Sequence, residues 1–280
     1  MIAATRHTAV TRLDLTDAVH SERMERPDGA TTVDWSTLDA VLFDLDGVLT
    51  PTAVIHERAW KAMFDAFLAA SADGGPWQPF SGDDYLAYVD GKRRVDGVRS
   101  FLASRGIVLP EGAIDDEPGH DTVNALGNAK NEAFQRVLRS DGIAPYPGSV
   151  RFLDALDRRG TAVGVVSSSR NAGEVLDAAG LADRFAVLVD GSVAAARQLP
   201  GKPAPDTFLA AAAELGVSPQ RTAVVEDAIS GVAAGHAGGF ALTVGVDRGA
   251  GHDALTEHGA DIVVDDLGDL DELLSAAGAP

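Results

Sequence analysis

Short apolar runs rich in Val, Leu and Ala recur along the chain. Runs of this kind are typical of strands buried on both faces of a parallel sheet. Helix-like stretches separate most of the runs, and the first run is broken by Gly47. This alternation predicts an α/β fold with a doubly wound parallel-sheet core. The predicted strands are residues 40–45, 162–167, 186–189, 222–226, 241–246 and 262–264.

The pattern changes after the first run, where strand-like segments are missing as far as about residue 144. Helical patterns occupy residues 56–70, 83–88, 97–104 and 122–139, with loops at 71–80 and 108–121. We therefore expect an inserted, all-helical domain between two segments of one core domain. The predicted boundaries are 37–52 and 146–280 for the core and 53–145 for the insert.

The two ends of the chain have weaker patterns. Residues 1–36 mix charges, Thr and a Pro-Asp-Gly turn signal at 27–29 without a sustained period. We expect an N-terminal arm there, with at most a short helix near residues 15–24. Residues 266–277 are predicted to form a last helix.

Charge limits the partners that the protein can have. The chain has 280 residues, of which 45% are hydrophobic, so it can form a proper core. Its 23 Lys and Arg stand against 42 Asp and Glu, which gives a formal net charge of −19. Because this surface repels polyanions, no nucleic acid partner is expected. A phosphate ester would have to be held by a few local cations or by a metal.

Cysteine and long apolar segments are both missing from the sequence. Without Cys, disulfides, thiolate catalysis and Cys-based zinc sites are excluded. The opening residues are too polar for the apolar core of a signal peptide, and no uncharged apolar run has the length of a membrane span. We expect a cytoplasmic protein with no membrane partner, either a monomer or a weak dimer.

The first predicted strand ends on two carboxylates. Asp44 and Asp46 are two residues apart, and Gly47 eases the turn that follows them. Both side chains can then point into the crevice at the carboxyl end of the sheet, where ligands of α/β proteins bind. A solvated Asp-Gly turn is the ordinary alternative. A calcium loop is excluded because Val48 and Thr50 occupy the positions of a ligand and a glycine.

Three further segments suit phosphate or metal. The hydroxyls that begin at Ser167 could hold phosphate oxygens or simply cap a helix. Lys202 is fixed between Gly and Pro, whereas most lysines lie free on the surface. Glu226 and Asp227 end a buried strand, where unpaired charges are costly unless a cation is shared with Asp44.

The order and spacing of these four motifs resemble the haloacid dehalogenase superfamily of aspartyl phosphotransferases. A two-component receiver domain has a similar acid and Lys set, but it is shorter and lacks a helical insert. The resemblance implies a Rossmann-like core and a helical cap. It also implies that Asp44 is the nucleophile and Asp46 the general acid and base, while Ser167 and Lys202 clamp the transferring phosphoryl oxygens.

The same resemblance implies Mg²⁺ as cofactor. A carboxylate and a phosphoryl group repel each other, so the transfer needs positive charge that holds both in line. Oxygen ligands suit this hard cation, which typically keeps waters as its other ligands. The implied ligands are Asp44, the main-chain carbonyl of Asp46, Glu226 and Asp227.

Within the superfamily, the insert resembles the cap of the β-phosphoglucomutase branch, through residues 52–60, 91–96 and 129–131. By this resemblance, Arg94 grips the phosphate that is not transferred, His56 and Lys130 position Asp46 and the sugar, and Thr52 lies at the hinge. The implied contacts to phosphate and substrate also include Ser168, Ser169, Arg170, Asn171 and Trp60.

Simpler interpretations of the cap residues stay open from the sequence. The basic run at residues 92–94 could be a solvated surface, and His56 and Trp60, four apart on one helical face, could pack the cap. Val95 and Gly97 depart from the branch, whose motif usually has an acid and a Ser there, and so leave the choice of substrate open.

Three functions follow in order of preference. The first is a mutase that converts β-glucose 1-phosphate to glucose 6-phosphate through phospho-Asp44 and a 1,6-bisphosphate. The second is a phosphatase for a sugar or polyol phosphate, with water as the acceptor. The third is an inactive protein kept for binding, against which the complete set of Asp44, Asp46, Lys202 and Asp227 argues. In the first two cases the partner is a small sugar phosphate.

Overall fold

The computed structural model describes residues 24–25, 31–32, 35–72 and 74–270. The chain divides into two units, Met1–Val33 and Asp34–Pro280. In the first, β1 (Met24–Glu25) pairs antiparallel with β2 (Thr31–Thr32). The helix expected near residues 15–24 lies outside the described residues except for Met24, which belongs to β1.

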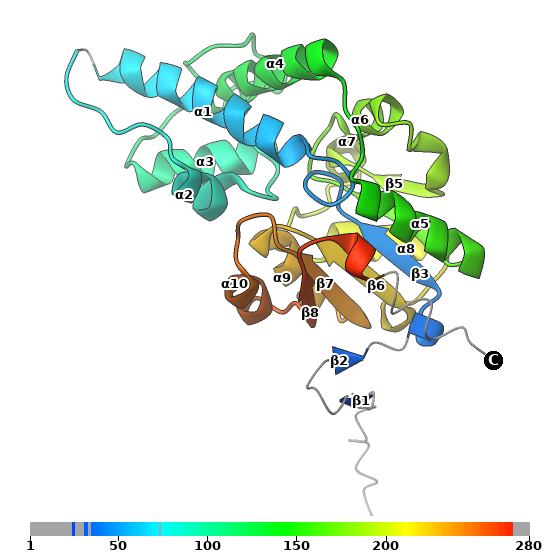
Figure 1. Cartoon of the computed structure of the whole chain (residues 1–280). Helices are drawn as coiled ribbons and strands as arrows, with labels where there is room; N and C mark the ends of the chain where they lie inside the picture. Colours follow the sequence, from blue (N-terminus) through cyan, green and yellow to red (C-terminus); the bar gives the residue numbers. More distant parts are fainter. Residues whose placement is uncertain (1–23, 26–30, 33–34, 73, 271–280) are drawn as a thin grey trace, which may run out of the picture. The chain divides into compact units, whose positions relative to one another are not determined.

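The second unit is built on a six-stranded parallel sheet, as the sequence predicted (Figure 1). Its strand order, β5-β4-β3-β6-β7-β8, runs outward in both directions from β3 and β6, which is the doubly wound arrangement. Each predicted run contains a strand. The strands are β3 (Ala40–Phe43), β4 (Ala162–Val166), β5 (Val187–Val189), β6 (Thr222–Glu226), β7 (Leu242–Val246) and β8 (Ile262–Val264).

The central strand β3 is buried on both faces because successive side chains point to opposite sides. Leu42 packs in a cluster with Phe208 and Val224. Phe43 packs edge-on against Phe152, with 6.0 Å between ring centroids, and Phe152 also contacts Trp35. Apolar burial on both sides fixes β3, and with it the position of the residues that follow.

Helices cover both faces of this sheet (Figure 1). Phe208 belongs to α8 and Phe152 to α5, so these two helices lie on opposite faces. The helices are α5 (Pro147–Arg159), α6 (Ala172–Ala178), α7 (Gly191–Ala196), α8 (Asp206–Leu215), α9 (Ile229–Ala237) and α10 (His252–Glu257). Single 3-10 turns are η1 (Trp35–Thr37), η3 (Ala182–Arg184), η4 (Pro219–Arg221) and η5 (Leu267–Leu270). Of the last predicted helix, the described part forms η5.

Between β3 and α5 the described residues form helices and no named strand. Their apolar faces share a core of their own in which Phe64, Phe80 and Phe101 are fully buried. The elements are α1 (Thr52–Ser71), α2 (Gly82–Asp84), the π-helical turn η2 (Tyr85–Val89), α3 (Arg94–Ser104) and α4 (Val123–Asp141). These helices begin within a few residues of the predicted starts. The division into core and cap at residues 53 and 145 stays a prediction.

No helix in the described part of the chain combines the length and the apolar character that a bilayer span requires.

Candidate active site

The carboxyl ends of the central strands meet at a buried ion cluster. Lys202, in the loop before α8, places its Nζ 2.5 Å from Asp44 Oδ1 and 2.5 Å from Glu226 Oε1. It also donates to the carbonyl oxygen of Val166 at the end of β4 (3.2 Å). The side chains of Lys202 and Glu226 are 1% exposed. The sequence-predicted Lys202 is therefore a positioned charge and not a surface lysine.

The loop after β3 turns tightly under Asp44. The backbone N–H of Asp46 donates to Asp44 Oδ2 (2.8 Å), which fixes the carboxylate relative to its own chain. Gly47 has a φ of +92°, and a Cβ at this position would lie 1.8 Å from Asp227 Oδ2. Glycine is thus required both by the turn and by the close approach of Asp227.

This buried cluster has more carboxylates than cationic groups. Burial raises the pKa of Asp44, although the Lys202 ammonium opposes the rise. Burial also raises the pKa of Glu226 to about 8, and burial with the charges of Asp90 and Asp44 raises the pKa of Asp227 well above its usual value. Burial lowers the pKa of Lys202, but the carboxylates of Asp44 and Glu226 more than reverse this. One lysine cannot compensate three carboxylates.

A divalent cation fits this deficit. Carboxylate oxygens of Asp44, Glu226 and Asp227 all lie within 4.8 Å of one another. Asp227 forms no ion pair with any residue that the structure describes, so its charge is available to a ligand. Hard oxygen donors of this kind suit Mg²⁺. The Asp46 side chain is directed to other partners, so its implied role as a ligand would fall to its main-chain carbonyl.

Asp46 is surrounded by the residues predicted to position it. Thr52 donates a short hydrogen bond to Asp46 Oδ1, and His56 Nε2 lies 3.3 Å from the same oxygen. Ser167 donates to Asp46 Oδ2 at 3.4 Å. Burial raises the pKa of Asp46, but the nearby His56 imidazole and the Thr52 hydroxyl outweigh it and lower this pKa to about 2. Asp46 is therefore held as a carboxylate.

Behind Asp46, His56 and Lys130 form a buried pair. Lys130 Nζ hydrogen-bonds His56 Nδ1, and the imidazole stacks on Phe134 with 4.0 Å between centroids. Burial lowers the pKa of Lys130 to about 7, which the charge of Asp46 only partly offsets. Trp60 packs in the helical core and also lies under the Lys130 ammonium, 5.1 Å from its ring centroid. Trp60 therefore packs the helical insert, and its contact with substrate stays a prediction.

Lys130→Met should stabilise the protein most at low pH. The pKa of Lys130 is about 7 in the folded protein, against 10.5 for a lysine in water, so its destabilising contribution is fully present below pH 7 and disappears as pH rises to about 10. The advantage of the variant over wild type should shrink by up to about 1.4 kcal/mol per pH unit above pH 7. Urea unfolding at pH 7 and pH 9 measures it. Lys61→Met, on the exposed side of α1, is the control and should show no such trend.

A second group of predicted residues lines the cavity above the ion cluster. Arg94 begins α3, and its stem packs against Gly127 of α4, where a Cβ would lie 3.3 Å away. Burial and the nearby charge of Arg170 lower the pKa of Arg94 to about 10. Neither guanidinium forms an ion pair within the described residues. The predicted residues that line this cavity are Asp44, Asp46, His56, Trp60, Arg94, Lys130, Ser168, Ser169, Arg170, Asn171 and Asp227.

The remaining predicted residues lie behind these. Thr52, Ser167, Lys202 and Glu226 are buried and do not line the cavity, but they bind the residues that do. Asn171 serves as a link to the helical insert, since its Nδ2 donates to Asn131 Oδ1 (2.7 Å).

Sequence reasoning missed three polar residues of the cavity, Tyr85, Asp90 and Asn124. Asp90 directly precedes Gly91, which was part of a recognised motif, and that adjacency was the available signal. No pattern shows which residues of 85–90 face inward, because a π-helical turn changes the helical period there.

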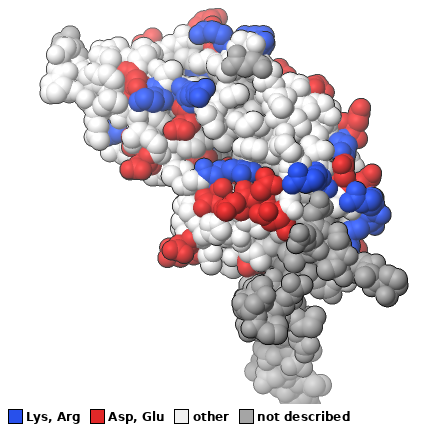
Figure 2. Space-filling model, in the orientation of Figure 1, with Lys and Arg blue, Asp and Glu red and all other residues white. Residues whose placement is uncertain are grey.

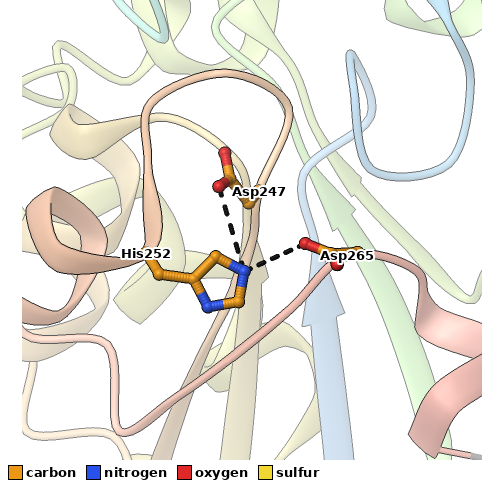
Figure 3. A group of neighbouring side chains, drawn as sticks. All are labelled: Asp247, His252 and Asp265. Atoms are coloured by element: carbon orange, nitrogen blue, oxygen red, sulfur yellow. Dashed lines mark hydrogen bonds and ion pairs between the residues drawn. The ribbon is translucent and has the colours of Figure 1, made fainter.

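A second cluster at the ends of β7 and β8 does not take part in this site. His252 Nε2 lies 2.9 Å from Asp265 Oδ1 and 3.9 Å from Asp247 Oδ2 (Figure 3). The hydrogen bond with Asp265 raises the pKa of His252, which favours an ion pair with the carboxylates. We interpret the three residues as an exposed ion-pair cluster. On the face drawn in Figure 2, Lys and Arg side chains lie next to Asp and Glu side chains.

Comparison with known proteins agrees with this geometry. The sequence profile of haloacid dehalogenase-like hydrolases matches residues 38–239. The chain belongs to the haloacid dehalogenase-like hydrolase family. The match begins just before β3 and ends after α9, so it includes all four motifs of the site.

Several members of this family are similar to the chain over most of its length. A β-phosphoglucomutase from Mycobacterium bovis is 53% identical over 238 residues, which cover 82% of this chain and 90% of that protein. A β-phosphoglucomutase from Bacillus subtilis is 35% identical over 236 residues, 83% of this chain and 92% of the relative. The solved structure of a Clostridium difficile β-phosphoglucomutase shares the haloacid dehalogenase-like fold, with a TM-score of 0.66 at 24% identity, over 85% of this chain and 98% of that one.

Proposed function

We propose that the protein is a β-phosphoglucomutase, which converts β-glucose 1-phosphate to glucose 6-phosphate through a phospho-aspartate at Asp44. The observation that carries the proposal is the pair of guanidinium groups of Arg94 and Arg170 at the cavity. They are separate from Lys202, which is bound to Asp44 and Glu226. A mutase holds an intermediate with two phosphates, and the two arginines offer a second cationic site in addition to the one at Asp44, where Lys202 and the proposed Mg²⁺ would supply positive charge.

The first half of the reaction uses phosphorylated Asp44. With the 1-phosphate of the sugar held by Arg94, the 6-hydroxyl faces Asp46, which accepts its proton as the oxygen attacks phosphorus. The bond between phosphorus and Asp44 breaks, which frees the carboxylate and forms the 1,6-bisphosphate. The low pKa of Asp46, about 2, keeps it ionised for this step.

The second half runs in the opposite sense after the bisphosphate turns over in the cavity. Asp44 attacks the 1-phosphate, and Asp46 returns its proton to the leaving oxygen at C1, so glucose 6-phosphate is released and phospho-Asp44 is restored. Lys202 and Ser167 hold oxygens of the moving phosphoryl group throughout. Thr52 and His56, bound to Asp46, keep its carboxylate aimed at the sugar oxygen.

Mg²⁺ is the cofactor that we propose, held by Asp44, Asp227, Glu226 and the main-chain carbonyl of Asp46. When bound, it neutralises the phosphoryl oxygens and keeps the acceptor and leaving oxygens in line. Its charge also offsets the carboxylates that Lys202 alone leaves uncompensated. Removal of divalent cations by a chelator should therefore stop turnover.

Arg94→Ala tests the mutase against the alternative phosphatase. Without the second phosphate site, isomerisation of β-glucose 1-phosphate should fall about 100-fold or more in kcat/KM, because a charge-assisted bidentate contact is lost. Glucose 6-phosphate and free phosphate are measured in the same reaction. Arg99→Ala, an exposed arginine of the same helix that pairs with Glu111, is the matched control and should keep wild-type rates.

One outcome for Arg94→Ala would favour a phosphatase. If Arg94→Ala releases free phosphate at the wild-type rate and wild type itself makes little glucose 6-phosphate, the second cationic site has no role and the mutase proposal fails.

A further inference from the structure

The cavity contains one carboxylate for which phosphoryl transfer has no use. Asp90 lies between η2 and α3 and lines the cavity with Asp44 and Asp46. It forms no ion pair with any described residue. Its charge acts on the reaction centre, since it contributes to the raised pKa of Asp227. The charges of Asp44 and Lys202 in turn influence the pKa of Asp90. A half-buried anion beside sites for two phosphates is electrostatically costly, so its presence calls for a reason.

The backbone at Asp90 is held from the sheet side. The Ser230 hydroxyl donates to the carbonyl oxygen of Asp90 (3.0 Å), and the Ser168 hydroxyl donates to that of Gly91 (2.7 Å). Gly91 has a φ of +67°, and a Cβ there would lie 2.3 Å from Ser230 Oγ. These contacts join the helical insert to the loop after β4 and to the first turn of α9, and they fix the backbone that carries the Asp90 carboxylate.

The carboxylate itself is only partly used by the protein. The Tyr85 hydroxyl and the backbone N–H of Gly91 lie near it and lower its pKa, although burial outweighs them. An ionised carboxylate can accept about four hydrogen bonds. Acceptor positions therefore remain for a ligand, and a group that supplies donors without negative charge is required to fill them.

We propose that Asp90 binds ring hydroxyl groups of the sugar and so determines which phosphate ester the enzyme accepts. This inference rests on the proposed function, because a hexose between two phosphate sites presents hydroxyls that can donate to Asp90. A hydrogen bond from a neutral hydroxyl to a carboxylate is strong in a dry cavity. A substrate that lacks the matching hydroxyl leaves the carboxylate unpaired and is rejected.

The test compares Asp90→Ala and Asp90→Asn with wild type on three kinds of substrate. These are β-glucose 1-phosphate, its 2-, 3- and 4-deoxy analogues, and p-nitrophenyl phosphate, which has no sugar. Asp83→Ala, an exposed carboxylate in α2, is the matched control and should keep wild-type rates. Thermal melting of each variant establishes that it is folded.

Asp90→Ala should lower kcat/KM for β-glucose 1-phosphate about 10- to 100-fold, mainly through KM, and at least tenfold more than for p-nitrophenyl phosphate. For the deoxy analogue that lacks the hydroxyl bound by Asp90, the kcat/KM of wild type should be lower by a similar factor. Asp90→Ala should not lower kcat/KM for that analogue any further. Asp90→Asn, which keeps an acceptor, should fall between the two. The inference is overturned if the loss is the same for every deoxy analogue and for p-nitrophenyl phosphate, which would mean that Asp90 only supports the fold.

The outcome for Asp90 is separable from that for the proposed function. If wild type releases free phosphate from β-glucose 1-phosphate and forms no glucose 6-phosphate, the mutase proposal is wrong. The comparison between sugar and p-nitrophenyl phosphate then decides the role of Asp90 from hydrolysis rates alone.

Discussion

Asp44→Asn should abolish isomerisation, with a loss of at least about 10⁴-fold in kcat, as found when a covalent nucleophile is removed. An amide cannot accept the phosphoryl group, and the variant also removes the negative charge that Lys202 contacts at 2.5 Å. The Lys202–Glu226 ion pair remains, so the fold should survive. The rate of glucose 6-phosphate formation measures the effect.

A second measurement on Asp44→Asn examines the covalent step itself. Wild type incubated with Mg²⁺ and acetyl phosphate should gain the mass of one phosphoryl group, and the variant should not. Asp183→Asn, an exposed carboxylate on the core, is the matched control and should be phosphorylated like wild type. Phosphorylation or normal turnover of Asp44→Asn would overturn the assignment of the nucleophile.

Asp46→Asn should separate phosphorylation from sugar chemistry. Loss of the proton acceptor should lower isomerisation about 10²- to 10⁴-fold. Acetyl phosphate has a good leaving group that needs little proton transfer, so Asp44 should still become phosphorylated in the variant. The predicted result is a phospho-protein that cannot pass its phosphoryl group to β-glucose 1-phosphate, which intact mass and product assays detect together.

Thr52→Val is the control for Asp46→Asn. Thr52 and His56 contact the same carboxylate oxygen, so Thr52→Val should reduce the rate by a smaller factor through misorientation of Asp46. If Asp46→Asn isomerises at the wild-type rate, Asp46 carries no proton and another base must serve the sugar hydroxyl.

The sequence predicted the sheet and the cluster of polar residues at the carboxyl ends of its strands, and there is a physical reason for this. Strands buried on both faces need apolar residues throughout, so a polar residue at a strand end such as Asp44 or Asp227 stands out against them. Parallel strands then place their carboxyl ends at one edge, which brings residues far apart in sequence to one cluster. The contacts of Lys202 with Asp44 and Glu226 follow from that geometry.

The cap side of the cavity was less predictable. Arg94 and Lys130 were found through resemblance, and the basic run at residues 92–94 also fitted a solvated surface. Asp90 was missed because the direction of its side chain depends on the π-helical turn Tyr85–Val89. It also depends on hydrogen bonds that the hydroxyls of Ser168 and Ser230 donate to the backbone. Such contacts join distant segments and leave no periodic signal in the chain.

The proposed mutase is tested most directly by following two products at once. Purified wild-type protein is given Mg²⁺, β-glucose 1-phosphate and a trace of glucose 1,6-bisphosphate, and glucose 6-phosphate and free phosphate are both measured. Our account predicts that glucose 6-phosphate accumulates without matching free phosphate. Free phosphate released in step with substrate loss, without glucose 6-phosphate, would contradict it and identify a phosphatase.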